Sequence, residues 1–136
     1  MKKRVHEERM GSRVRFFRWV FFGLAWALVG CIALQTLFAG MAIFNDPGHW
    51  GKHEMFVHFF QFVPLIMLIF NAAGRLPKGT GWLTLASFLL IYLQYMTAHL
   101  PAAGALHPVM ALVLIVLTLL VARRASAAVF RRGAEE

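Results

Sequence analysis

Between Gly79 and Ala122 the chain contains no Asp, Glu, Lys or Arg. A charge-free run of this length is enough for two membrane-spanning helices, since each needs about 20 largely apolar residues to cross the hydrocarbon core. Over the whole chain 15% of the residues are charged, whereas soluble domains carry about 25%. We therefore predict an integral membrane protein with a single domain over residues 1–136 and no soluble module.

Apolar runs separated by turn residues divide the chain into four predicted spanning helices. Their expected bounds are about 16–44, 53–73, 82–100 and 107–124. This pattern predicts an all-α fold, a four-helix transmembrane bundle. Pro64 lies inside the second helix, where its ring removes one backbone hydrogen bond, so we expect a kink there.

The basic start of the chain, followed by apolar residues, also resembles a signal peptide. Small residues at 39–42 would offer a cleavage point. The apolar run is much longer than the h-region of a signal peptide, which has about 7–15 residues, so an uncleaved first helix is favoured. The only cysteine, Cys31, falls inside this helix and cannot form an internal disulfide.

The distribution of basic residues predicts the orientation. Thirteen of the fourteen Lys and Arg lie in the N-terminal tail, in the loop after the second helix or in the C-terminal tail, and only Lys52 lies on the other side. The positive-inside rule then places both termini on the cytoplasmic side of a membrane that the chain crosses several times. The net charge of +8 is explained by this topology and by lipid headgroups, without a nucleic acid partner. We expect Arg75 and Lys78 to serve orientation more than chemistry.

Five of the six histidines fall on the predicted outer side. They are His49, His53, His58, His99 and His107. A single histidine at a membrane interface is usually a polar rim residue, but five on one side suggest a site for haem or another metal. His53 and His58 lie about 140° apart around a helix, so they cannot both face one centre. His58 is the deeper of the two and is the better candidate for a buried role.

A haem takes one or two axial imidazoles from facing helices, between apolar walls. His58 on the second helix and His107 on the fourth fit this description, with His99 as the alternate ligand. We predict bis-histidine haem b, with His58 and His107 as the metal ligands. The residues expected to surround the cofactor are His58, His107, His99, Gln61, Tyr95 and Ala111. Gln61 and Tyr95 would orient the imidazoles from behind.

Part of the chain resembles haem A synthase. Glu54-Met55-Phe56-Val57-His58 looks like the Glu-x-x-x-His element in the halves of that enzyme, and residues 106–111 look like its Leu-His-x-x-x-Ala motif. In that family these histidines ligate haem within four-helix units, so the resemblance implies the same role for His58 and His107. This chain has one such unit instead of two, and Pro108 follows the second histidine.

A second resemblance covers most of residues 40–124. The His53-x4-His58 pair, Arg-Leu-Pro at 75–77 and Leu-His-Pro-Val at 106–109 are similar to an uncharacterised family of small bacterial four-helix membrane proteins. This resemblance implies the fold and a multi-pass protein of the bacterial cytoplasmic (inner) membrane, and it carries no known activity.

Three functions remain open from the sequence. The first is a haem b-binding, cytochrome b-like protein for electron transfer or haem handling. The second is a non-catalytic accessory or structural subunit whose polar residues hold helices together. The third is a periplasm-facing metal site built from Asp46, His49 and His53. The expected partners are the lipid bilayer and another membrane protein or a quinone. No catalytic or nucleotide-binding motif is present, and enzymatic activity is left open.

Overall fold

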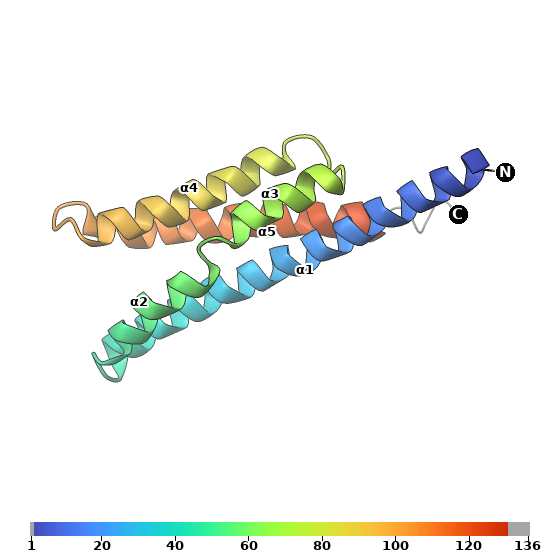
Figure 1. The fold of residues 1–136 in the computed structure, drawn as a ribbon. Helices are drawn as coiled ribbons and strands as arrows, with labels where there is room; N and C mark the ends of the chain where they lie inside the picture. Colours follow the sequence, from blue (N-terminus) through green and yellow to red (C-terminus); the bar gives the residue numbers. More distant parts are fainter. Residues whose placement is uncertain (1, 131–136) are drawn as a thin grey trace.

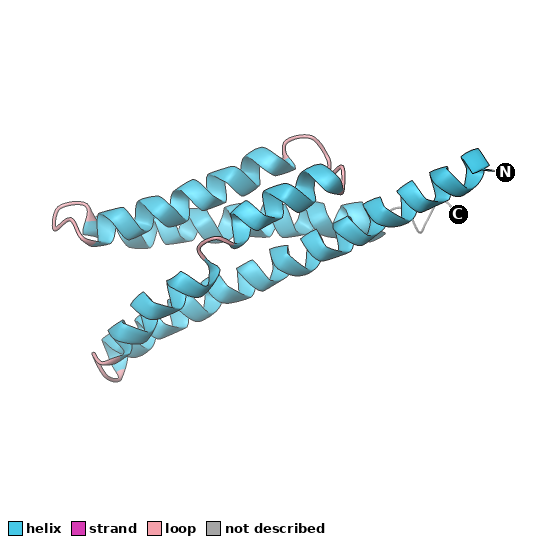
Figure 2. Ribbon diagram, in the orientation of Figure 1, coloured by secondary structure: helices cyan, strands magenta, loops and turns pink. Residues whose placement is uncertain are grey.

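The structure is a computed structural model that describes residues 2–130, with side chains from Gly11 onward. The described residues form helices joined by short turns, with no strand among them (Figure 2). In chain order the elements are α1 (Lys2–Phe44), α2 (His49–Phe60), α3 (Val63–Ala73), α4 (Thr80–Ala98), the 3-10 helix η1 (Gly104–Leu106) and α5 (His107–Phe130).

Four stretches of the described chain are long and apolar enough to cross a membrane. They are Gly11–Phe44, His49–Ala73, Thr80–Ala98 and Gly104–Phe130. The predicted all-helical bundle of four spanning helices is therefore confirmed. Helix α2 begins at His49, before the expected start at residue 53, and α5 continues to Phe130, beyond the expected end near residue 124.

The second span is broken into α2 and α3. Pro64 occupies the first turn of α3 and has no N–H to donate to the carbonyl of Phe60, four residues earlier. Gln61 and Phe62 form the turn between the two helices. The kink predicted at Pro64 is confirmed, and the structure shows a full interruption of the helix.

The core lies on one stripe of α1 and on the facing sides of α3, α4 and α5. Phe21, Ala25, Leu28 and Ile32 follow the three- and four-residue spacing of a helix face, and all are buried. Their buried neighbours are Met67 on α3, Ile91 on α4, and Leu114, Val121, Ala122 and Ala125 on α5.

Small polar residues line the buried face where α4 meets α5. The hydroxyls of Thr84, Ser87 and Thr118 donate to the carbonyl four residues earlier in their own helix, at 2.9, 2.9 and 3.0 Å. Because each hydroxyl has a hydrogen-bond partner within its own helix, burying these side chains costs little free energy. Their small size lets the two helices approach closely, as small residues do in membrane proteins generally.

One end of the bundle, here called the basic end, contains the loop 74–79, the end of α5 and the start of α1 (Figure 1). Arg18 of α1 joins these parts. Its guanidinium donates to the carbonyl oxygens of Gly74 at 2.8 Å, Arg75 at 3.2 Å and Ala128 at 3.5 Å. Gly74 is buried, and a Cβ at this position would lie 2.8 Å from Leu76 Cδ2 and 3.3 Å from the Arg18 backbone nitrogen. The close approach of α1 to this loop therefore requires glycine.

The opposite end, here called the histidine end, contains the α1–α2 turn and the α4–α5 connection. Toward this end α2 follows α1, while α4 and α5 stay together, so that the two pairs diverge from the break at Gln61–Phe62 onward (Figure 1). Helix α3, in contrast, packs against both α1 and α4. The break at Pro64 thus decides which helices α2 contacts.

Candidate functional site

The histidines at the histidine end are placed by two different helix pairs. His49 and His53 lie in the first turns of α2, and His58 lies in its last turn. His99 is the residue that ends α4, and His107 begins α5 after η1. The predicted gathering of five histidines at one end is thus present, but four of them form two separate groups, and His49 lies one turn before His53.

The first group is formed by His53 and His107, whose ring centres lie 6.1 Å apart. The Nδ1 atom of His53 lies 2.9 Å from the Gln35 carbonyl oxygen, and Nδ1 of His107 lies 3.3 Å from the Gln94 carbonyl oxygen. A carbonyl oxygen only accepts, so both Nδ1 atoms carry the proton. Each ring therefore keeps a lone pair on Nε2, which is the form of imidazole that binds a metal.

His53 is fixed to α1 by a reciprocal pair of hydrogen bonds. The Gln35 side-chain Nε2 donates to the His53 carbonyl oxygen at 2.8 Å, while the His53 ring donates to the Gln35 carbonyl oxygen. Trp50 covers the His53 ring edge-on, with ring centres 5.6 Å apart. Histidines that bind metals are oriented by such bonds from Nδ1 to a carbonyl.

Two buried polar atoms beside this pair have no hydrogen-bond partner among the residues that the structure describes. They are Gln35 Oε1 and His49 Nδ1. His49 lies one helical turn before His53, so both side chains project from the same side of α2. An unsatisfied buried polar atom costs about 1–3 kcal/mol, so a polar group reaching this place would be stabilising.

The second group is formed by His58, Tyr95 and His99, on the side where α2 faces α4. The ring of Tyr95 lies 5.9 Å from that of His58 and 5.1 Å from that of His99. All three side chains are exposed. The His99 Nδ1 donates to the Tyr95 carbonyl oxygen at 2.9 Å, in the last turn of α4, where a carbonyl has no helical partner.

The hydrogen bond of His58 differs from those of His53 and His107. Its Nδ1 lies 3.1 Å from Nε2 of Gln61, which is a donor, so the His58 Nδ1 must accept. The proton of the His58 ring is then on Nε2, and that nitrogen acts as a hydrogen-bond donor. His58 therefore has the tautomer that suits it least to bind a metal through Nε2.

The sequence predicted that His58 would face His107, and the structure brings His53 to His107 instead. Gln61 lies in the turn after α2 and contacts His58, as expected from their spacing, and Tyr95 contacts both His58 and His99. Ala111 is partly buried, four residues after His107 on α5. Neither Gln35 nor Gln94 was among the residues predicted to surround the cofactor. A glutamine within an apolar helix was the available signal at Gln35, but it did not show that His53 would be the partner. At Gln94 the contact with His107 is made by the backbone carbonyl, for which the residue type gives no signal.

Three-ligand metal centres are not found in the described part of the chain. No group of three or more His, Cys, Asp and Glu side chains lies close enough together there to hold a metal ion. Asp46 accepts a hydrogen bond at 2.9 Å from the backbone N–H of Gly48, which forms the turn before α2. Asp46, His49 and His53 therefore do not form such a group of three among the described residues.

The fold and the site together define a class: four-span helical membrane bundles with a polar, histidine-bearing end. Within that class, the chain belongs to DUF6220, a family of unknown function, which matches residues 35–103. The match includes His53, His58 and His99 and ends before His107. It agrees with the resemblance to an uncharacterised family, and nothing in the comparisons supports the resemblance to haem A synthase. No curated protein and no solved structure matches the chain.

Proposed function

We propose that this chain is a protein of the bacterial cytoplasmic membrane that binds haem b at its histidine end and serves electron transfer or haem handling. The observation that carries this proposal is the facing pair His53 and His107. Both rings leave Nε2 free for a metal, and both are oriented by a carbonyl at Nδ1. With both termini on the cytoplasmic side, the pair lies toward the outer face of the membrane.

The donor set fits haem better than zinc. A porphyrin supplies four nitrogens, so the protein adds only one or two ligands, whereas zinc takes three or four ligands from the protein. The described residues offer a pair of imidazoles and no group of three. Metal–imidazole bonds of about 2 Å place the centres of two axial rings about 6 Å apart, and the two rings here lie 6.1 Å apart.

Besides its ligands, a haem requires apolar walls, room for the porphyrin and a polar partner for its carboxylates, and residues near the two histidines offer these. Phe38 of α1 and Phe56 of α2 pack edge to face at 5.4 Å, on the pair of helices that holds His53. Ala111 lies one turn after His107 and adds little bulk to that face of α5. His49, with its buried and unpartnered Nδ1, is the residue that we expect to bind a haem carboxylate.

The second candidate is a structural subunit without a cofactor. It is favoured by the reciprocal hydrogen bonds between Gln35 and His53, which join α1 to α2 whether or not a ligand is present. Polar side chains often hold membrane helices together in this way. His107 would then only add a second hydrogen bond to the Gln94 carbonyl oxygen, which also accepts from the Thr97 hydroxyl.

Visible absorption of the protein, purified from cells supplied with haem, separates the two candidates. We expect a low-spin spectrum that His53→Ala and His107→Ala each abolish. His58→Ala and His99→Ala are the matched controls, because both remove an exposed imidazole from the same end and both should keep the spectrum. If His58→Ala abolishes it and His53→Ala does not, the sequence-based pairing of His58 with His107 is right. A wild-type protein that takes up no haem would favour the structural subunit.

A further inference from the structure

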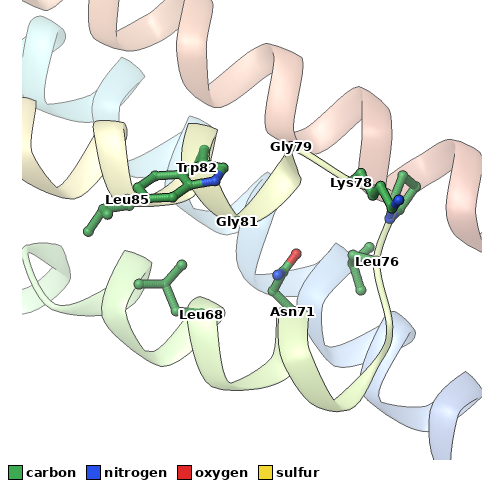
Figure 3. Close-up of a pocket in the computed structure, with 9 residues that line it drawn as sticks. Leu68, Asn71, Leu76, Lys78, Gly79, Gly81, Trp82 and Leu85 are labelled. Atoms are coloured by element: carbon green, nitrogen blue, oxygen red, sulfur yellow. The ribbon is translucent and has the colours of Figure 1, made fainter.

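A groove lies at the basic end, between α3 and α4, far along the bundle from the histidines. Its volume is about 370 Å³. Figure 3 shows Leu68 and Asn71 of α3 on one side, Trp82 and Leu85 of α4 on the other, and Lys78 in the loop that joins the two helices. The groove thus has polar groups at its mouth and apolar walls along the helices.

Two glycines keep this region open. A Cβ at Gly81 would lie 2.9 Å from Asn71 Nδ2, so any side chain there would displace the amide. Gly79 has a φ of +85°, which favours glycine, and a Cβ on it would lie 3.0 Å from Arg124 Nη1. The Arg124 guanidinium therefore reaches the loop and donates to the Lys78 carbonyl oxygen at 3.2 Å. Lys78 is thus the cation that lines the groove, and Arg124 is a second cation beside its loop, outside the lining.

These cations have no carboxylate nearby in the sequence. From residue 55 to residue 134 the chain contains no Asp or Glu. Among the residues that the structure describes, neither Lys78 nor Arg124 has an ion-pair partner. An anion in the groove would therefore meet an uncompensated positive charge.

The position of Trp82 sets the depth of the groove in a bilayer. Trp82 is 76% exposed at the start of α4, and exposed tryptophans concentrate at the level of the lipid headgroups. Leu68 and Leu85 lie farther from the loop along α3 and α4 (Figure 3), which is the direction of the hydrocarbon for two spanning helices. A phospholipid has the complementary chemistry, because its phosphate would meet the cations at the headgroup level and an acyl chain would follow the apolar walls below.

We propose that this groove binds an anionic phospholipid. Its phosphate lies against Lys78, with Arg124 beside the same loop, its glycerol backbone lies beside Trp82, and one acyl chain follows Leu68 and Leu85. Basic pockets between spanning helices are known binding places for anionic headgroups. The site is independent of haem binding, because it uses the opposite end of the bundle.

The test uses the full chain with Trp19, Trp26 and Trp50 replaced by Phe, so that Trp82 is the only tryptophan and can be excited selectively. The protein is reconstituted into bilayers in which either phosphatidylglycerol or phosphatidylcholine carries brominated acyl chains that quench tryptophan. Quenching gives the binding constant of one lipid relative to the other at Trp82. We expect phosphatidylglycerol to be preferred, and Lys78→Gln to lower the preference about fivefold, as expected for one basic residue near the surface.

Arg123→Gln is the matched control, since Arg123 is an exposed cation on the same turn of α5 as Arg124 and does not line the groove. It should leave the preference unchanged. Equal quenching by the two lipids, or an equal loss in Lys78→Gln and Arg123→Gln, would overturn the proposal. A third outcome would also overturn it: added inorganic phosphate abolishes the preference for phosphatidylglycerol, while chloride at the same ionic strength does not. The site would then bind free phosphate. If quenching decreases as the amount of protein per lipid is raised, a second copy of the chain occupies the groove, and the proposal is also overturned.

Discussion

Removing Arg18 should loosen the basic end of the bundle. The last carbonyls of a helix have no partner within it, and two of the carbonyls that Arg18 contacts are of this kind: Gly74 ends α3, and Ala128 is in the last turn of α5. The third belongs to Arg75, in the loop before α4. One guanidinium on α1 therefore joins three segments that are far apart in the sequence, and Arg18→Ala removes all of these bonds at once.

The size of the effect follows from the geometry of these hydrogen bonds. Two of them, at 2.8 and 3.2 Å, have good lengths, and the third, at 3.5 Å, is long enough to add little. A hydrogen bond with a charged donor contributes about 1.5–3 kcal/mol. Arg18 is partly exposed, and screening reduces the contribution of an exposed charge. We therefore expect Arg18→Ala to lower the free energy of unfolding by about 2–4 kcal/mol.

Reversible unfolding in mixed micelles, followed by circular dichroism, measures this difference. Arg15→Ala is the control, because Arg15 is an exposed cation on the same helix, and it should change the free energy of unfolding by less than about 0.5 kcal/mol. Arg18→Lys should recover about half of the loss, since an ammonium lacks the planar fork that reaches several carbonyls. Equal stabilities of Arg18→Ala and Arg15→Ala would refute the reasoning.

Three further outcomes are expected. Reporter fusions at both ends of the chain should report cytoplasm, and a periplasmic signal from either would overturn the topology. Gly79→Ala should lower the free energy of unfolding by about 1–3 kcal/mol, because its φ is positive and its Cβ would approach Arg124; Gly23→Ala, in open space on α1, should not destabilise. Gln35→Leu should lower the free energy of unfolding by about 0.6–1.7 kcal/mol, because it removes the hydrogen bond to the His53 carbonyl. An unchanged unfolding midpoint would contradict this.

The sequence alone determined the class of fold, because the bilayer imposes strict conditions on composition. A spanning segment must be apolar over about 20 residues and must satisfy its own backbone, which leaves the helix as the only choice for runs such as 79–122. The break at Pro64 was also readable, since the missing N–H is a property of the residue itself. Helix ends were harder to predict from the sequence. Helix α2 begins at His49, before the predicted start, because the turn formed by Asp46 leads directly into it.

The sequence also determined which residues share a face of one helix, and it separated His53 from His58 by their spacing. Only the tertiary structure decided which of these faces meets α5. Periodicity fixes the angle between side chains around one axis, but not how that axis is rotated against its neighbours. Here Gln35 binds the backbone and ring of His53 and turns that side of α2 toward His107. His58 is thereby left facing Tyr95 on α4, and the tautomer of each ring follows from the group that happens to lie beside its Nδ1.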